Sequence, residues 1–195
     1  MSGTGGPRMF VVRHEKRPVD DPSFFVSLTD EGKADAADVV AAQLHSLGIT
    51  KVYASPFRRV LQTVQPFVSC AGLKVHVDWA LYEHPEPNPE PVTTLPASFH
   101  VDFALAADYQ PYLAGAGIAA CNTSLDDVHT RVRGLLRRLA ESHGDGDVLL
   151  LATHQTAVHS LLHQQSGIPM ECLSVAMGTV VELRWREIIN YGDGA

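Results

Sequence analysis

Apolar and polar residues alternate along this chain in blocks that predict strands and helices in turn. Four short apolar runs are typical of buried strands of a parallel sheet: residues 10–12, 51–54, 74–77 and 148–153. Four longer segments carry apolar side chains at helical spacing: residues 29–47, 57–71, 124–144 and 156–165. This alternation predicts an α/β protein, a three-layer αβα sandwich with a mostly parallel central sheet and helices on both faces.

Local signals refine the element boundaries. Thr29 can cap the helix over 29–47, and Gly48 is placed to end it. Pro66 lies inside the helix over 57–71 and predicts a kink or a break there, because proline lacks an amide hydrogen. Near the end of the chain, residues 179–185 alternate apolar and polar side chains, which is typical of a strand at the edge of a sheet.

The regular pattern disappears between Glu83 and about Thr123, where prolines cluster. A stretch of this length inside a compact domain is usually a functional insertion. We therefore expect an insertion, a lid, near residues 84–123. We expect residues 1–8 to be a flexible N-terminus and residues 9–195 to form one domain, because no other change in composition marks a boundary.

Composition and charge exclude several classes of function. The chain has 195 residues and a formal net charge of -7, which argues against a nucleic-acid partner, since that would require a basic surface. No apolar run approaches the roughly 18 residues that a membrane span needs, so we expect no membrane partner. The three cysteines form no CxxC pair, which predicts free thiols and a cytoplasmic location. The sequence carries no signal of the oligomeric state.

Reactive side chains follow the predicted strands at the point where each strand ends. Arg13 and His14 end the first strand, and Arg59 follows the second. Glu83 comes after the third strand, and His154 ends the strand over 148–153. Because the carboxyl ends of parallel strands meet at one edge of a sheet, we expect these groups to converge on one site. Two histidines and two arginines in one crevice indicate a site that holds a phosphate group and attacks it.

Four motifs, taken in their order along the chain, resemble those of a known family. They are Arg13-His14-Glu15, the Leu-Thr-x-x-Gly segment over 28–32, Ser-Pro-Phe-Arg-Arg-Val-Leu-Gln-Thr over 55–63, and His154-Gln155. This set is similar to that of the histidine phosphatase superfamily, the phosphoglycerate mutase-like branch 1, and it covers nearly the whole chain. The resemblance implies a metal-independent phosphomonoester hydrolase that needs no cofactor and holds no metal.

The resemblance also implies roles for individual residues. His14 corresponds to the nucleophile, which forms a phosphohistidine. Arg13, Arg59 and His154 correspond to the ligands of the phosphate oxygens, and His154 is counted with the catalytic residues. Glu83 corresponds to the general acid and base, which protonates the leaving oxygen and then helps to activate water.

A narrower resemblance concerns the first motif. Residues 13–17, Arg-His-Glu-Lys-Arg, are similar to the Arg-His-Gly-Glu-Arg of a eukaryotic branch. That branch includes the suppressor-of-T-cell-receptor-signalling proteins and ecdysteroid-phosphate phosphatase. It implies that Arg17 is a further phosphate ligand and that the substrate is a small-molecule or protein phosphomonoester.

Two alternative functions stay open. The first is phosphoglycerate mutase-type transfer, although residues 16–19 lack the Ser-x-x-Asn-like segment of the family's mutases and thus favour hydrolysis. The second is a catalytically silent relative that binds a phosphorylated ligand or protein. Glu15 supports this second alternative, because the family has a glycine there that lets the backbone approach the phosphate. The Glu15 side chain either enters the phosphate pocket or turns away and holds the His14 ring by accepting its second N–H.

Overall fold

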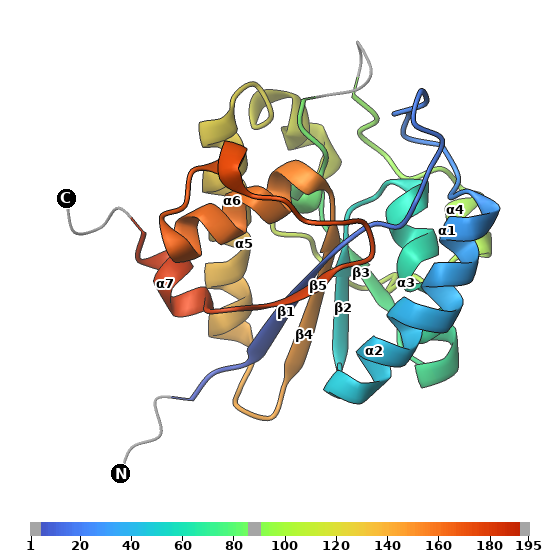
Figure 1. Ribbon diagram of the computed structural model, residues 1–195, viewed down its shortest axis with the longest axis horizontal. Coiled ribbons are helices and arrows are strands. Elements are labelled where there is room, and N and C mark those ends of the chain that lie inside the picture. The colour runs from blue at the N-terminus through green and yellow to red at the C-terminus, as the bar shows by residue number, and fades with distance from the viewer. Residues whose placement is uncertain (1–4, 86–90, 192–195) are drawn as a thin grey trace.

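The computed structural model describes residues 5–85 and 91–191 and contains a five-stranded sheet (Figure 1). The strands are β1 (Arg8–Arg13), β2 (Lys51–Ala54), β3 (Val75–Val77), β4 (Val148–Thr153) and β5 (Val180–Leu183). Their order across the sheet is β3-β2-β4-β1-β5. The first four run parallel, and β5 pairs antiparallel with β1 at the edge, as the alternation over 179–185 predicts.

Helices cover both faces of the sheet (Figure 1). One face carries α1 (Asp30–Asp35), the π-helical turn η1 (Ala36–Val40), α2 (Ala41–Leu47) and α3 (Arg58–Ala71). The other face carries α5 (Leu125–Ser142), α6 (Gln155–Ser166) and α7 (Trp185–Ile189). Alternate residues of each strand enter opposite cores: Phe10 and Leu150 face the α3 side, whereas Val11 and Leu151 face the α5 side. The predicted three-layer sandwich is confirmed.

The helix that Thr29 and Gly48 are predicted to bound begins and ends at these residues, whereas Pro66 does not interrupt its helix. The Thr29 hydroxyl accepts a hydrogen bond from the Gly32 amide, and Gly48 ends the α1–η1–α2 stretch with a φ of 68°. Pro66 does not break α3, which runs continuously through it. Its neighbours Val64 and Phe67 are buried in the core, and their burial outweighs the one hydrogen bond that proline costs.

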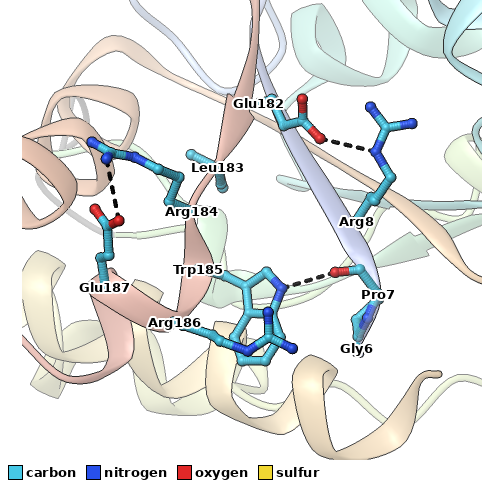
Figure 2. Close-up of a pocket in the computed structure, with 9 residues that line it drawn as sticks. All are labelled: Gly6, Pro7, Arg8, Glu182, Leu183, Arg184, Trp185, Arg186 and Glu187. Carbon is cyan, nitrogen blue, oxygen red and sulfur yellow. Dashed lines mark hydrogen bonds and ion pairs between the residues drawn. The ribbon is translucent and has the colours of Figure 1, made fainter. Parts of the chain in front are cut away.

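The segment before β1 is held against the end of the chain (Figure 2). The Trp185 indole donates to the Pro7 carbonyl at 2.8 Å, and Arg8 pairs with Glu182 at 2.9 Å. The Arg186 guanidinium stacks on Trp185 at 4.4 Å. β1 begins at Arg8, two residues before the start of the expected strand. Residues 1–4 of the expected flexible N-terminus lie outside the described residues.

The insertion that follows η2 (Trp79–Leu81) packs against the β3 edge of the sheet. It contains the short helices α4 (Phe99–Asp102) and η3 (Gly115–Ala120), and residue Leu105 forms a parallel bridge to Val75 of β3. Residues 86–90, with two of the clustered prolines, lie outside the described residues.

A buried carboxylate ties this insertion to the sheet. Asp78 accepts hydrogen bonds from the Tyr109 hydroxyl at 2.7 Å and from the amides of Tyr112 and Leu113. Asp78 lies five residues before Glu83. Its hydrogen bonds therefore fix the backbone shortly before the segment that carries Glu83.

Two further findings concern the chain as a whole. None of the helices in the described ranges combines the length and apolar character that a membrane span requires. The three cysteines, Cys70, Cys121 and Cys172, are free, as the sequence predicts.

Candidate active site

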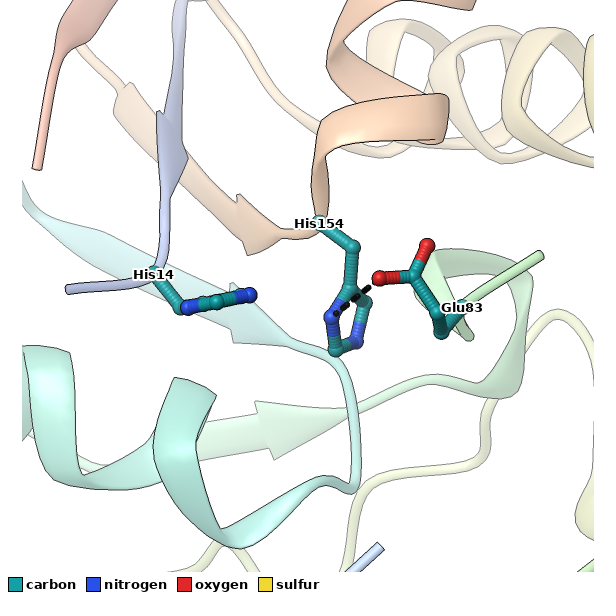
Figure 3. A group of neighbouring side chains, drawn as sticks. All are labelled: His14, Glu83 and His154. Atoms are coloured by element: carbon teal, nitrogen blue, oxygen red, sulfur yellow. Dashed lines mark ion pairs between the residues drawn. The ribbon is translucent and has the colours of Figure 1, made fainter. Parts of the chain in front are cut away.

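The carboxyl ends of the parallel strands bring two histidines and a carboxylate together. His14 follows β1, His154 follows the neighbouring β4, and Glu83 follows η2 (Figure 3). The two imidazole rings meet edge to face with centroids 5.3 Å apart. The Glu83 carboxylate lies 3.3 Å from Nδ1 of His154. Three groups far apart in the sequence thus share one cluster.

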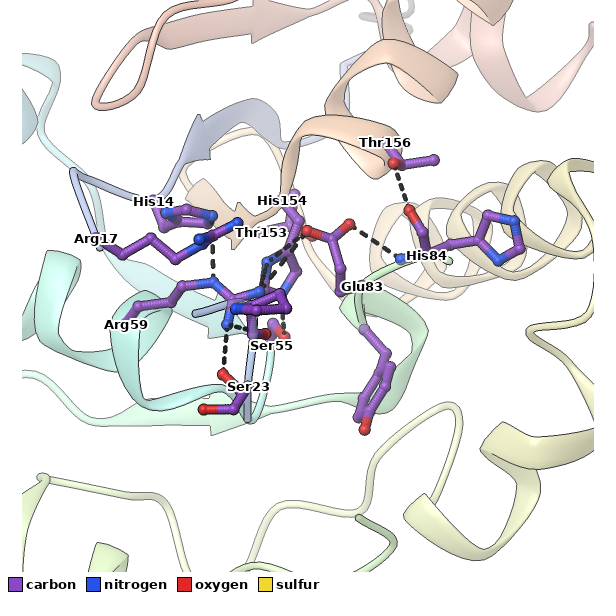
Figure 4. Close-up of polar contacts among 12 residues, drawn as sticks. His14, Arg17, Ser23, Ser55, Arg59, Glu83, His84, Thr153, His154 and Thr156 are labelled. Carbon is purple, nitrogen blue, oxygen red and sulfur yellow. Dashed lines mark hydrogen bonds and ion pairs between the residues drawn. The ribbon is translucent and has the colours of Figure 1, made fainter. Parts of the chain in front are cut away.

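Arg59, from the first turn of α3, connects these groups (Figure 4). Its side chain is only 1% exposed. Nε donates to Nε2 of His14 at 3.2 Å, while Nη2 lies 3.2 Å from Nδ1 of His154 and 3.7 Å from the Glu83 carboxylate. Nη1 donates to the carbonyls of Pro22 and Ser23, which anchors the guanidinium. A fixed cation therefore lies between both histidines and the carboxylate.

The hydrogen bonds of His14 define its tautomer. Since Arg59 can only donate, Nε2 of His14 accepts, and Nδ1 carries the proton. Nδ1–H donates to the backbone carbonyl of Glu15 at 2.8 Å. Burial lowers the pKa of His14 well below its usual 6.5, and the nearby His154 and Arg59 lower it further. The ring is therefore neutral near pH 7, and its Nε2 lone pair points into the site.

His154 and Glu83 form a coupled pair. Burial lowers the pKa of His154 to about 4, although Glu83 acts in the opposite direction. Burial alone would raise the pKa of Glu83, but His154, the His84 amide and Arg59 outweigh it and lower the value to about 2. The Ser55 hydroxyl contacts Nε2 of His154 at 2.8 Å. With no substrate present, the carboxylate is ionised and the ring is neutral.

Arg13 and Arg17 lie near the cluster, whereas Arg58 points away from it. Nη1 of Arg13 donates to the Val175 carbonyl at 2.6 Å, and its buried Nε has no hydrogen-bond partner in the described structure. Arg17 donates to three carbonyls of the loop over 18–21 and lies beside His14 and Arg59 (Figure 4). Arg58 leaves the site: it pairs with Asp102 at 3.3 Å and stacks on α4 of the insertion. The motif register, which selects Arg59 over Arg58, thus agrees with the geometry.

A cavity of about 200 Å³ opens in front of these groups. Its lining residues are Arg13, His14, Arg17, Val19, Glu83, Gln155 and Met177. Helix α6 begins beside it, directly after His154, and its first turn has no side-chain cap. Uncapped amides and the positive end of a helix favour an anion at this position. The cavity, two arginines and the helix terminus together form an anion-binding site.

The same cluster could in principle bind a metal ion, because ligand atoms of His14, Glu83 and His154 lie within 4.8 Å of one another. The Arg59 guanidinium, however, contacts both rings and faces the carboxylate. A fixed positive charge in this position disfavours a divalent cation and favours an oxyanion. The charge of Arg59 thus suits an anion at this cluster better than a metal ion.

Glu15 does not enter this cavity. Its side chain is buried, accepts from the Lys16 amide at 3.2 Å and lies against Gly178, where any side chain would clash with the carboxylate. It lines a separate cavity of about 400 Å³. Glu15 does accept the second N–H of the His14 ring, but with its backbone carbonyl. The expectation that its carboxylate does so is wrong. The Glu15 amide donates to the Thr63 hydroxyl at 2.9 Å, which holds the backbone of Glu15 in place.

Two residues that the sequence pattern does not identify, Arg131 and Asn122, hold the backbone at Glu83 by hydrogen bonds. Arg131 of α5 is buried and donates to the carbonyls of Ala80 and Tyr82 and to the Asn122 side chain. The Asn122 amide in turn donates to the Glu83 carbonyl at 2.8 Å. A buried arginine on an amphipathic helix is a weak signal. Nothing in the sequence relates Asn122 to a carboxylate 39 residues away.

Comparisons with known proteins agree with this geometry. The family model described as "Histidine phosphatase superfamily (branch 1)" matches residues 25–188. A comparison with curated protein sequences finds no match.

Several solved structures share the fold. The ecdysone phosphate phosphatase of Bombix mori, in complex with tungstate, has a TM-score of 0.67 and 17% identity, over 91% of this chain and 89% of that one. A mycobacterial glucosyl-3-phosphoglycerate phosphatase has a TM-score of 0.63 and 21% identity, over 90% and 89%. The phosphoserine phosphatase of Entamoeba histolytica has a TM-score of 0.60 and 15% identity, over 90% and 89%.

The first of these structures is an ecdysone phosphate phosphatase, from the branch that residues 13–17 resemble, and at 17% identity it demonstrates the shared fold. The three neighbours are named for different substrates, so the fold alone selects none of them. The family model covers most of the chain, including Arg59, Glu83 and His154. The expected enzyme class is confirmed at the level of the family: the chain belongs to the histidine phosphatase superfamily, branch 1.

Proposed function

We propose that this protein is a metal-independent phosphomonoester hydrolase that works through a phosphohistidine on His14. One observation carries the proposal. A neutral His14 ring directs its Nε2 lone pair at a buried guanidinium, with an ionised carboxylate across the site. A nucleophile, an oxyanion ligand and a proton carrier in contact are the parts that phosphoryl transfer requires.

In the first half-reaction, Nε2 of His14 attacks the phosphorus and the bond to the leaving oxygen breaks. Substrate phosphate oxygens replace Nε2 as the partner of the Arg59 Nε–H. Nδ1–H stays on the Glu15 carbonyl, where it stabilises the positive charge that the ring gains. Arg13, Arg59, Arg17 and His154 would bind the phosphate oxygens, since guanidinium groups match them in geometry and charge.

Glu83 moves the protons. A bound phosphate group places negative charge beside this carboxylate, which raises its pKa above the value of about 2 in the empty site. Glu83 then takes the proton of the substrate monoanion and gives it to the leaving oxygen, which departs as the alcohol. In the second half-reaction the carboxylate takes a proton from water, the hydroxide attacks phosphorus, and the bond to His14 breaks.

The direct test is hydrolysis of phenyl phosphate in the presence of a metal chelator. We expect release of phosphate at mildly acidic to neutral pH, unchanged by the chelator, because Arg59 supplies the charge that a metal would otherwise provide. Colorimetric phosphate release measures this. Activity that disappears with the chelator and returns on addition of a divalent ion would contradict the proposal.

Two observations favour hydrolysis over mutase-type transfer. The site opens to solvent past the exposed side chains of Val19 and Gln155, so water can reach a phosphohistidine. The groups beyond Glu83 include the carboxylate of Glu171, which suits a phosphoglycerate poorly. The reaction we propose therefore releases phosphate. Its substrate is a small-molecule or protein phosphomonoester, and the three free thiols fit the reducing cytoplasm as its location.

Replacing Glu15 with alanine tests whether its carboxylate takes part in the reaction. We expect kcat/KM for phenyl phosphate to stay within about threefold, because the carboxylate lies outside the phosphate cavity and alanine keeps the carbonyl on His14. Steady-state kinetics of the variant and of Glu15→Gln measure this. A loss of about 100-fold in both would place the carboxylate in the chemistry.

Replacing Asn122 with alanine tests the support of Glu83. We expect kcat for an alkyl phosphate to fall about tenfold with KM unchanged, because the carbonyl of Glu83 loses its donor and the carboxylate shifts. The first-turnover rate with p-nitrophenyl phosphate should change by less than about twofold, since that leaving group needs no proton. The control is Asn190→Ala, on the exposed end of α7. Equal losses with both esters would indicate general disruption.

A further inference from the structure

A second, larger cavity adjoins the phosphate site. Its volume is about 540 Å³, within the range of sites that bind small molecules. Arg17, Glu83 and Gln155 line both this cavity and the phosphate cavity. The two therefore meet at the Glu83 carboxylate, and we refer to the larger one as the outer cavity.

The position of Glu83 determines what the outer cavity holds. In the proposed reaction the oxygen that receives the proton of Glu83 is bonded to phosphorus on one side and to the alcohol on the other. With the phosphoryl group against His14 and Arg59, the alcohol extends past Glu83 into the outer cavity. The chemistry of its lining then decides which alcohol binds.

The outer cavity has an apolar part beside polar groups that include His84, Thr156 and His159. Pro22, Pro85, Leu125 and Met170 contribute to it from four separate segments of the chain. Leu125 is 47% exposed although it is a large apolar residue. The mouth of the adjoining phosphate cavity carries two more exposed apolar side chains, Val19 and Met177. Exposed apolar groups gathered around one opening are typical of a surface that binds an apolar ligand.

The charges of the outer cavity disfavour an anionic alcohol. Glu83 and Glu171 both line it. Its arginines among the described residues are Arg17 and Arg59, and both serve the phosphate side. His84 and His159 also line it, and burial lowers the pKa of His159, which disfavours its charged form. Nη1 of Arg17 donates to loop carbonyls, and Arg59 contacts His14, His154 and two carbonyls. A second carboxylate or phosphate on the substrate would thus meet two carboxylates, with neither lysine nor a further arginine among the described lining residues to pair with it.

We propose that the outer cavity binds the leaving group and selects phosphomonoesters of neutral, largely apolar alcohols larger than a three-carbon unit. The proposal rests on the proposed function, because it takes Glu83 as the proton donor. It names the substrate class of the site: esters with an apolar body, in preference to phosphoglycerate-like esters that carry a second negative charge.

Three esters with the same primary leaving oxygen test this selectivity: propyl phosphate, 3-phenylpropyl phosphate and 3-(4-carboxyphenyl)propyl phosphate. The reacting centre is identical, so differences in kcat/KM report binding in the outer cavity. We expect the phenylpropyl ester to exceed the propyl ester by about tenfold or more, and the carboxylate to cancel this gain. Values within about threefold for all three, or a preference for the carboxylate, would overturn the proposal.

A charge placed in the outer cavity should change the preference. In Met170→Arg we expect the ratio of kcat/KM for the carboxyphenyl ester to that for the phenyl ester to rise about tenfold or more, because the new guanidinium pairs with the carboxylate. The matched control is Val101→Arg, which adds the same charge at an 87% exposed position of α4 outside the cavity. If the ratio rises equally in both variants, the effect comes from net charge, and the proposal that the outer cavity binds the leaving group is refuted.

Calorimetry separates failure of this proposal from failure of the proposed function. The corresponding phosphonates, propylphosphonate and 3-phenylpropylphosphonate, bind without being cleaved. If none of the esters is hydrolysed, the proposed function fails, and the phosphonate affinities still measure the outer cavity. Equal affinities for the two phosphonates would overturn the cavity assignment by themselves.

Discussion

Replacing His14 with alanine is expected to abolish phosphatase activity, lowering kcat/KM for phenyl phosphate by about 10⁴-fold or more. His14 supplies the bond to phosphorus, and no other group in the cluster can substitute for it. Nδ1 of His154 faces Glu83, and its Nε2 contacts Ser55. Enzyme quenched in alkaline detergent should carry phosphate that is stable to base and labile to acid in the native protein, and none in the variant.

The control for this experiment is His100→Ala, at an exposed position of α4 away from the site. Its activity should equal that of the native protein. Thermal unfolding of both variants shows whether the fold survives, because His14→Ala also removes the partner of the Arg59 Nε–H. A folded His14→Ala variant with more than about 1% of native activity would contradict the assignment of the nucleophile.

Replacing Glu83 with glutamine is expected to lower kcat for an alkyl phosphate by about 10²- to 10³-fold. Glutamine keeps the shape of the side chain but cannot carry a proton to the leaving oxygen. With p-nitrophenyl phosphate, whose leaving group departs as the anion, the first turnover should stay fast. The second half-reaction still lacks its base, so we expect a burst of nitrophenol followed by slow turnover.

Rapid-mixing measurements with both esters distinguish these phases. The control is Glu141→Gln, at an exposed position near the end of α5. Slow first turnovers with both esters would show that Glu83 acts on the site as a whole, through its ion pairs with Arg59 and His154, and would contradict the proton-transfer role.

The sequence predicted much of the fold because each signal is local. Apolar runs identify β1, β2 and β4, and helical spacing identifies the helices that connect them. Pro66 predicts a kink or a break, and the break is absent because the local rule competes there with burial of α3 against the sheet, which the local pattern does not contain. The local pattern likewise does not contain the contact of Trp185 with Pro7, which are far apart in the sequence.

The grouping of His14, Arg59, Glu83 and His154 also follows from the sequence by itself. Each lies just past the carboxyl end of a predicted strand, and parallel strands place those ends at one edge of the sheet. Covalent order and strand direction are enough to predict that they meet, with no knowledge of any side-chain contact.

Only the tertiary structure decided how these groups are oriented. The backbone of Glu15 contacts Thr63 and its carboxylate lies against Gly178, both on other segments, and the side chain lines a cavity other than the phosphate cavity. The support of Glu83 depends on Asn122 and Arg131, which approach it through packing of α5. The outer cavity likewise takes its walls from six segments that are separate in the sequence. Orientation and cavity shape are set by contacts between residues distant along the chain, and the sequence pattern does not encode those distances.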